Sequence, residues 1–125
     1  MKSKIIRRSE AKVQETPWGK LEWMVGSGEA DYGMTMGRVT FKPGEQNPAH
    51  LHPNCDEILT VLQGTIEHSV PEGGTTVLKP GDAILLPRNK FHRAKNIGSE
   101  DAVVMVVFNS AHRQIIHEED QATKT

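Results

Sequence analysis

Short runs in which apolar and polar residues alternate make up most of the chain, and Gly, Pro, Asn and Asp separate them. Because successive side chains of a β-strand point to opposite faces, a period of two is typical of strands with one buried face. The runs predict eight strands, at residues 20–26, 33–41, 57–64, 65–70, 75–79, 83–87, 91–96 and 102–108. Eight strands of this length predict an all-β fold, either a sandwich or a closed barrel.

The turns between these runs combine two residues with special backbone preferences. Proline fixes φ and glycine accepts positive φ, so a proline followed closely by a glycine favours a reversal of the chain. Residues 42–45, 71–74 and 79–82 each contain such a pair. Residues 111–125 instead carry dense charge and few apolar side chains, which predicts a short helical or disordered C-terminal tail.

The chain length and the charge balance limit the domain count and the class of partner. A chain of 125 residues is typical of one domain. We expect a single domain over residues 1–125, with a core at about 20–110, an N-terminal arm at 1–19 and a C-terminal tail at 111–125. The 15 Lys and Arg balance 16 Asp and Glu. The sequence contains no block of basic residues, so we expect no binding to nucleic acid or to a membrane. The expected partner is a small molecule or a second copy of the chain.

The cysteine content and the N-terminus bear on the cellular compartment. Cys55 is the single cysteine, so no intrachain disulfide can form, and the cytoplasm is the expected location. The basic N-terminus is not followed by an apolar stretch, and no run approaches the roughly 18 apolar residues of a membrane span. We therefore expect neither a signal peptide nor a membrane anchor.

Two histidines one residue apart, His50 and His52, form the first part of a candidate metal site. In an extended chain both imidazoles point to the same face. Glu57 has the opposite parity, but the proline and the turn-prone Asn-Cys-Asp step before it can redirect the chain. His92, which follows a turn, is the best candidate for a fourth ligand. Spacing alone leaves open the alternative that these histidines are polar surface.

Three imidazoles and one carboxylate would suit a divalent transition metal such as Mn, Fe, Co, Ni, Cu or Zn. An octahedral ion would keep two positions open, which is the arrangement expected of a catalytic metal. The other histidines have no comparable setting, because His68 falls within a predicted strand and His112 and His117 fall in the polar tail.

Two motifs in the chain resemble the two signatures of the cupin family. Asn89 stands where the second signature usually has glycine, and asparagine tolerates left-handed backbone better than other non-glycine residues. The resemblance implies a small jelly-roll β-barrel that binds one divalent transition metal per chain, with Mn or Fe favoured over Ni, Cu or Zn. The matching positions are Gly44, His50, His52, Glu57 and Gly64 in the first motif, and Gly81, Pro87, His92 and Asn96 in the second.

Residues 37–53 and 106–110 are similar to germins and germin-like proteins, a group of cupins that bind manganese. Germins with oxalate oxidase activity hold their substrate with two asparagines near the metal. Asn47 matches one of them, and Gly37 stands in place of the other. The resemblance therefore implies a metal-bound organic acid or a related oxygen ligand, while the missing asparagine argues against oxalate itself.

Strand parity predicts the side chains that surround the metal. Val39, Phe41, Leu59 and Val61 should point inward and form a mostly apolar cup, and residues 104, 106 and 108 or their neighbours should close its far side. Such a cup suits a compact ligand with one or two oxygen donors. Phe41 and Leu59, together with Asn47, are the predicted substrate contacts. The alternative for these apolar residues is ordinary barrel core.

The outward faces of the predicted strands also carry apolar residues, which need cover from a second sheet or from a partner subunit. We favour a homodimer. Trp18 and Trp23 either contribute to the same interface or cap the end of the barrel. The outward apolar positions are Met34, Met36, Ile58 and Leu62.

The pattern as a whole favours a metal-dependent dioxygenase or oxidase that acts on a small chelating organic acid, enol or diol. One alternative is a metal-dependent isomerase, epimerase or lyase of sugars or sugar acids, which requires a second base that the sequence does not reveal. The other alternative is a non-catalytic cupin that binds a small ligand. We expect Cys55 to be an inert thiol, and we expect surface positions for Arg38, Arg88 and Arg93.

Overall fold

Strands are almost the only regular elements of the chain, so the all-β prediction is confirmed. The structure, a computed structural model, describes residues 3–26 and 32–119, and within them no helix is long and apolar enough to span a membrane. The elements are η1 (Arg8–Glu10), β1 (Lys12–Thr16), β2 (Gly19–Val25), β3 (Thr35–Phe41), β4 (His50–Leu51), β5 (Glu57–Gln63), β6 (Ile66–Val70), β7 (Gly74–Leu78), β8 (Ala83–Leu86), β9 (Arg93–Asn96), β10 (Ala102–Phe108) and β11 (Ile116–His117).

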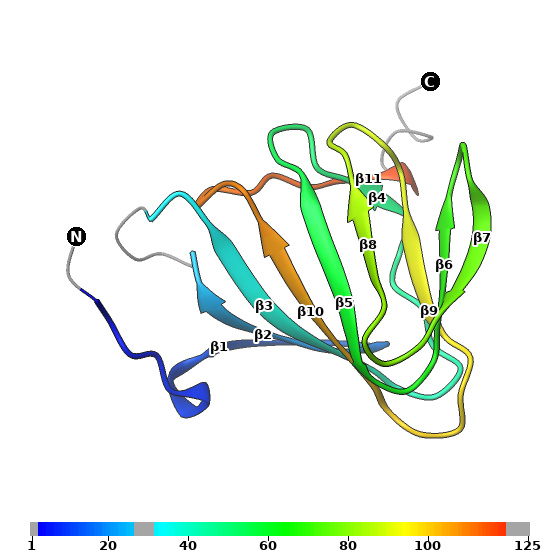
Figure 1. The fold of residues 1–125 in the computed structure, drawn as a ribbon, viewed down its shortest axis with the longest axis horizontal. Helices are drawn as coiled ribbons and strands as arrows, with labels where there is room; N and C mark the ends of the chain where they lie inside the picture. The colour runs from blue at the N-terminus through cyan, green and yellow to red at the C-terminus, as the bar shows by residue number, and fades with distance from the viewer. Residues whose placement is uncertain (1–2, 27–31, 120–125) are drawn as a thin grey trace.

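The strands form a barrel of jelly-roll type (Figure 1). A six-stranded sheet has the order β1-β2-β3-β10-β5-β8, a three-stranded sheet has the order β7-β6-β9, and β11 pairs with β4. The pairings are antiparallel, and β10 lies between β3 and β5. Late in the sequence, β10 thus pairs with β3 and β5, which come from the first half of the chain.

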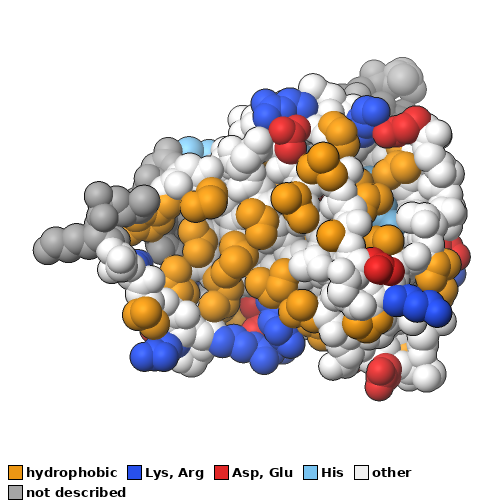
Figure 2. Space-filling view, in the orientation of Figure 1, with side chains coloured by type: hydrophobic (Ala, Val, Ile, Leu, Met, Phe, Trp, Pro, Cys, Tyr) orange, Lys and Arg blue, Asp and Glu red, His pale blue; other side chains and the backbone are white. Residues whose placement is uncertain are grey.

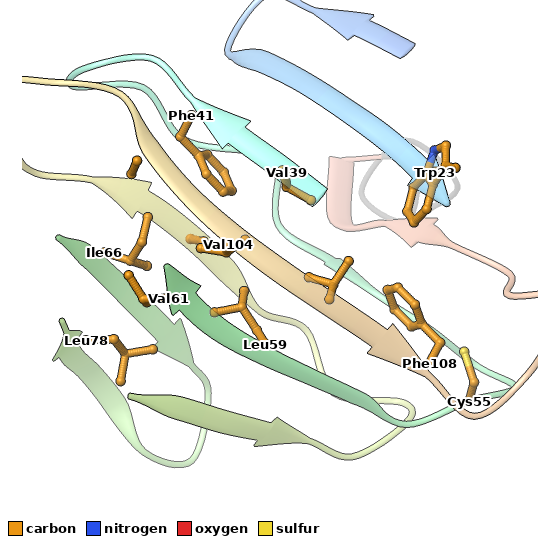
Figure 3. Close-up of a cluster of buried hydrophobic side chains, with 13 residues drawn as sticks. Trp23, Val39, Phe41, Cys55, Leu59, Val61, Ile66, Leu78, Val104 and Phe108 are labelled. Carbon is orange, nitrogen blue, oxygen red and sulfur yellow. The ribbon is translucent and has the colours of Figure 1, made fainter. Parts of the chain in front are cut away.

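The buried face of this sheet follows the predicted parity. In β3 the burial alternates residue by residue, with Val39 and Phe41 inward. Val104 of β10 lies opposite Val39 on one side and Val61 on the other, so the three valines form one row across the sheet. All the side chains that were predicted to point inward are buried, and most are labelled in Figure 3: Val39, Phe41, Leu59, Val61, Val104, Val106 and Phe108.

The two tryptophans pack inside the barrel rather than on its outer surface. Trp23 belongs to the buried core. The Trp18 ring stacks on Phe41 with the ring centroids 5.1 Å apart. Both rings therefore pack against the core of this chain.

Three strands are not predicted by the sequence pattern, namely β1, β4 and β11. β1 lies in the expected N-terminal arm and is mostly exposed, so its sequence has no pattern of buried apolar residues. It is a strand because its backbone pairs with that of β2. β4 and β11 have two residues each, which is too short for any periodicity to be recognised. The described part of the C-terminal tail thus contains a strand paired with β4, and residues 120–125 lie outside the described residues.

Candidate metal centre

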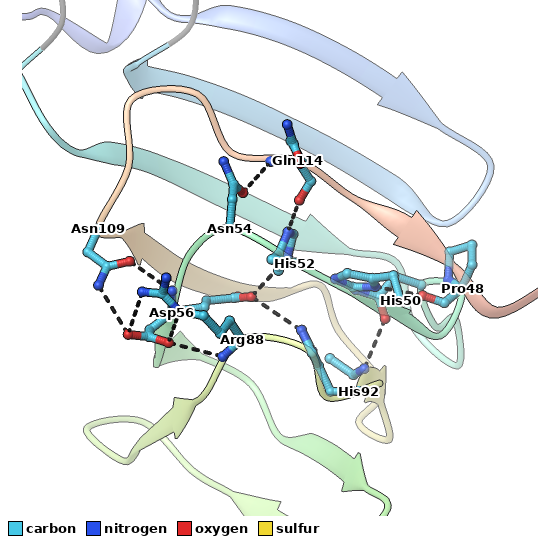
Figure 4. Close-up of polar contacts among 12 residues, drawn as sticks. Pro48, His50, His52, Asn54, Asp56, Arg88, His92, Asn109 and Gln114 are labelled. Carbon is cyan, nitrogen blue, oxygen red and sulfur yellow. Dashed lines mark hydrogen bonds and ion pairs between the residues drawn. The ribbon is translucent and has the colours of Figure 1, made fainter. Parts of the chain in front are cut away.

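The structure brings the four predicted ligands together at one point inside the barrel (Figure 4). His50 belongs to β4, His52 follows it, Glu57 begins β5 and His92 precedes β9. Each side chain is buried, and the four candidate ligand atoms all lie within 4.8 Å of one another. The alternative that these histidines are polar surface is therefore wrong.

Backbone pairing holds the two motifs in register. The His92 amide donates to the His50 carbonyl at 2.9 Å, and the His50 amide donates to the His92 carbonyl at 3.1 Å. The Asn89 amide donates to the His52 carbonyl at 3.0 Å. Asn89 has a φ of 65°, so asparagine here does adopt the left-handed conformation that glycine would supply. The turn survives the substitution, as predicted.

Two backbone carbonyls fix the tautomers of the neighbouring imidazoles. The Nδ1 atom of His50 lies 2.8 Å from the carbonyl oxygen of Pro48, and that of His52 lies 2.7 Å from the carbonyl oxygen of Gln114. A carbonyl oxygen can only accept, so Nδ1 carries the proton in both rings. The lone pair of each neutral ring is then on Nε2, which is the atom available to a metal.

The unpaired atoms of the cluster fit a bound cation. His52 Nε2 and Glu57 Oε1 are buried, lack a hydrogen-bond partner and lie 3.3 Å apart. His92 Nε2 lies 3.4 Å from the same carboxylate oxygen. Buried polar atoms nearly always have partners, and one cation among these atoms would satisfy them together. The donor set of nitrogen and oxygen atoms matches one divalent transition-metal ion.

Burial also keeps the imidazoles in the form that a metal requires. Loss of hydration disfavours the imidazolium, so burial lowers the pKa of His50 to about 4. Burial and then the neighbouring His50 ring lower the pKa of His92 to about 2. Both rings are therefore neutral near pH 7, and a metal would not have to displace protons from them.

A polar network beside Glu57 ties together the loops that carry the ligands (Figure 4). Arg88 donates from Nε to Asp56 Oδ1 at 3.1 Å and from its Nη2 to Oδ2 at 3.2 Å. Asn109 donates from Nδ2 to Asp56 Oδ2 at 3.1 Å. The hydrogen bonds from Arg88 lower the pKa of Asp56 to about 2. The network joins the start of β5, the turn before His92 and the end of β10.

The ligands face a cavity of about 220 Å³ inside the barrel. All three predicted substrate contacts, Phe41, Asn47 and Leu59, line it. The Ala94 amide donates to Asn47 Oδ1 at 2.9 Å, so the oxygen of this side chain is committed to the backbone of β9. The amide nitrogen of Asn47 is the part that a ligand can use. Contact with a substrate stays a prediction for all three residues.

Comparison with known proteins identifies the family. Residues 37–108, more than half of the chain, match the Cupin domain. The chain belongs to the cupin family. This cupin is 38% identical over 93 residues to a germin-like protein of Oryza sativa subsp. japonica, which covers 67% of this chain and 37% of that protein. It is 35% identical over 102 residues to an oxalate oxidase of Triticum aestivum, which covers 76% of this chain and 44% of the relative.

Solved structures show the same relationships. This cupin superposes on an oxalate oxidase in complex with the substrate analogue glycolate with a TM-score of 0.64 and 32% identity, over 69% of this chain and 46% of that chain. An oxalate decarboxylase mutant of Bacillus subtilis superposes with a TM-score of 0.83 over 95% of this chain and 33% of the other. At 22% identity, this second likeness shows the fold alone. This cupin therefore spans less than half the length of these relatives.

Gly37, the position that departs from the expected germin pattern, lies against the indole ring of Trp23. A Cβ atom at Gly37 would lie 2.6 Å from Cε3 of Trp23, a distance that non-bonded carbon atoms do not adopt. The indole ring thus occupies the space that the second asparagine would need. In this cupin an aromatic wall stands where that polar side chain would be.

Two cavity residues, His68 and Arg113, are not among the site residues predicted from the sequence. His68 is fully buried and stacks on His92, with ring centroids 5.5 Å apart, and neither of its ring nitrogens has a hydrogen-bond partner. His68 lies two residues after the inward residue Ile66 on the same strand, and this spacing could have predicted that its side chain points into the barrel. Arg113 lies in the C-terminal tail, and its guanidinium carbon lies 4.2 Å from the centroid of the Trp23 ring. No local pattern identifies Arg113.

The setting of Cys55 is typical of an unreactive thiol. Its side chain is completely buried, and burial raises its pKa. A reactive cysteine requires the opposite, an exposed thiol with a lowered pKa.

His52→Ala should abolish metal uptake by this cupin. The substitution removes one of four ligands, so the metal content should fall from about one ion per chain to below about 0.1. Elemental analysis of the purified protein measures this directly. His112→Ala is the matched control, because His112 has an exposed side chain outside the cluster, and it should leave the content unchanged. Full metal content in the His52 variant would contradict the ligand assignment.

The metal-free protein should lose stability as the pH falls from about 6.5 to about 4. Burial lowers the pKa of His68 to about 4, as it does for His50. In this window the unfolded chain binds protons that the folded state excludes, so each such histidine lowers the free energy of unfolding by about 1.4 kcal/mol per pH unit.

Urea unfolding of the chelator-treated protein at several pH values measures this slope. His68→Leu should reduce this slope by about 1.4 kcal/mol per pH unit, the contribution of one buried histidine. Equal slopes in the His68 variant and the unsubstituted protein would contradict the burial of a neutral imidazole.

Proposed function

We propose that this cupin is a metal-dependent oxidase or dioxygenase of a small organic acid that chelates the metal. The observation that carries the proposal is the convergence of His50, His52, Glu57 and His92, whose candidate ligand atoms lie within 4.8 Å of one another at the wall of a mostly apolar cavity. The similarity to a germin-like protein and to oxalate oxidases supports oxidative chemistry on an acid. Because the chain spans only part of those relatives, the activity is our inference for this chain.

The residues of the chain have separable roles in this proposal. The carbonyls of Pro48 and Gln114 orient two imidazoles by accepting from their Nδ1 atoms, so the ligand geometry is fixed before any substrate enters. Phe41 and Leu59 give the cavity apolar walls, and apolar surroundings strengthen the electrostatic interactions of a bound ligand. Bound manganese or iron would supply Lewis acidity towards the oxygen atoms of the acid and a route for electrons to dioxygen.

One observation favours a second candidate function, a redox-neutral isomerase or lyase. Such an enzyme needs a base near the metal. His68 lines the same cavity, and both of its ring nitrogens are free of hydrogen bonds. The two candidates differ in their need for oxygen and for a redox-active metal.

The metal-loaded protein should consume oxygen when it is given a compact chelating acid. We expect Mn- or Fe-loaded protein to consume oxygen with members of a panel of oxalate, glycolate and related 2-hydroxy acids, and Zn-loaded protein to show only background uptake. Chelator treatment should abolish the uptake, and addition of Mn or Fe should restore it. An oxygen electrode gives the rate.

The His52→Ala variant controls for oxidation by free metal. Conversion of a substrate without oxygen uptake, at equal rates with Zn and Mn, would contradict the oxidase proposal and favour the redox-neutral alternative.

We also propose that this cupin is a homodimer that uses the outer face of its six-stranded sheet. Met36, Val107, Ile58 and Leu85 lie opposite one another on the neighbouring strands β3, β10, β5 and β8. The exposed fractions are 49% for Ile58 and 67% for Leu85. Figure 2 shows apolar side chains gathered over this sheet. An apolar row of this kind is typical of a surface that a partner covers.

The double substitution Ile58→Lys and Leu85→Lys should convert the dimer to a monomer. Charges that face their own symmetry mates would be desolvated and repelled, so the dimer dissociation constant should rise by at least about tenfold. Light scattering after size exclusion measures the mass. Val77→Lys is the control, since Val77 is 47% exposed but lies on the three-stranded sheet. A monomeric unsubstituted protein would contradict the proposal.

A further inference from the structure

Arg113 is the one Lys or Arg side chain among the described residues that line the cavity. Its guanidinium carbon lies 4.2 Å from the centroid of the Trp23 ring and 5.4 Å from that of Phe108. These two aromatic faces support the guanidinium plane and limit the positions that it can take. Arg113 is thus a charged group held by the apolar wall of the cavity.

The charge of Arg113 has no carboxylate partner in the described part of the chain. Its contacts there are the two aromatic rings, and the Glu57 carboxyl is the acidic side chain that lines the same cavity. Glu57 belongs to the metal cluster, so its carboxylate is committed elsewhere. Burial disfavours the charge enough to lower the pKa of Arg113. A half-buried guanidinium has five N–H donors, and an anion in the cavity would give some of them a charged acceptor.

The charge balance of the cavity also favours a bound anion. Among the described residues, Glu57 is the one acidic side chain that lines the cavity and Arg113 is the one Lys or Arg. A divalent ion in the ligand set would leave the apolar cavity with an excess of positive charge. A ligand with one or two negative charges would balance this excess, whereas a neutral enol or diol would not.

The segment that carries Arg113 is anchored to the metal centre. Asn54 donates from Nδ2 to the carbonyl of His112 at 2.8 Å, and its Oδ1 accepts from the Gln114 amide at 2.9 Å. The carbonyl of Gln114 in turn accepts from His52 Nδ1 (Figure 4). Asn54 therefore holds both neighbours of Arg113, so the position of the guanidinium is linked to that of a metal ligand.

We infer that Arg113 binds a carboxylate of the substrate and thereby selects an acid over a neutral enol or diol. The inference rests on the proposed function, for whose acid substrate it names a specificity-determining residue. The planar guanidinium matches a carboxylate through two parallel hydrogen bonds. Arg113 is then the specificity-determining residue, in place of the asparagine side chain that Gly37 does not supply.

Binding of three molecules of equal shape tests this inference. Oxalate has two carboxylates, oxamate has one and oxamide has none. Calorimetric titration of Mn-loaded protein gives the affinity for each without any turnover. Arg113→Gln should weaken oxalate binding by about 10- to 100-fold, the loss expected for a charge-assisted pair, and should change oxamide binding by less than about threefold.

Two further variants complete the design. Arg7→Gln removes an equal charge from an exposed position away from the cavity, and it should bind all three molecules as the unsubstituted protein does. Arg113→Lys keeps the charge but not the planar fork of donors, so it should still prefer oxalate to oxamide with an affinity for oxalate between those of the unsubstituted protein and Arg113→Gln. This variant decides the question if Arg113→Gln fails to fold. Elemental analysis checks that the variants hold equal amounts of metal.

Each outcome separates the inference from the proposed function. Unchanged oxalate affinity in Arg113→Gln, or equal affinity for oxalate in Arg113→Lys and the unsubstituted protein, would overturn the role of Arg113 even if the protein consumes oxygen. A selective loss of oxalate binding would support that role even if no oxygen uptake is found with any acid, in which case the oxidase proposal alone fails.

Discussion

The convergence of three imidazoles and one carboxylate on a single buried point is the constraint on which the rest of this structure depends. Unpaired polar atoms inside a protein cost free energy, and His52 Nε2 and Glu57 Oε1 are such atoms. The barrel can hold them only because its strands fix their positions, and a cation that binds there would gain from the arrangement. A metal that binds these atoms in the folded state alone would therefore stabilise the fold.

Support for the cluster comes from segments that are far apart in the sequence. The carbonyl of Gln114 orients His52 from 62 residues away, and Asn109 reaches Asp56, beside Glu57, from the end of β10. The C-terminal segment is thus part of the site and not an appendage. It orients one ligand, presents Arg113 to the cavity and pairs with β4 through β11.

Much of this arrangement could be predicted from local patterns. All eight predicted strands exist, with ends that differ by at most two residues, because alternation reports directly which face of a strand is buried. The ligands were predicted because the two motifs keep them at fixed positions beside turns. His68 was within reach of the same reasoning, since it shares the inward parity of Ile66, but a histidine within a strand carries no distinctive signal.

The sequence by itself determined eight of the strands, their inward faces and the four candidate ligands, because each depends on side-chain direction along a short stretch of chain. Only the tertiary structure decided what shares the cavity with those ligands. Trp23 fills the space beside Gly37 through the pairing of β2 with β3, and Arg113 reaches the cavity through contacts of a polar tail with Asn54. Such contacts join residues that are far apart in the sequence, so no repeating local pattern can predict them. The chemical character of the pocket therefore depends on tertiary packing.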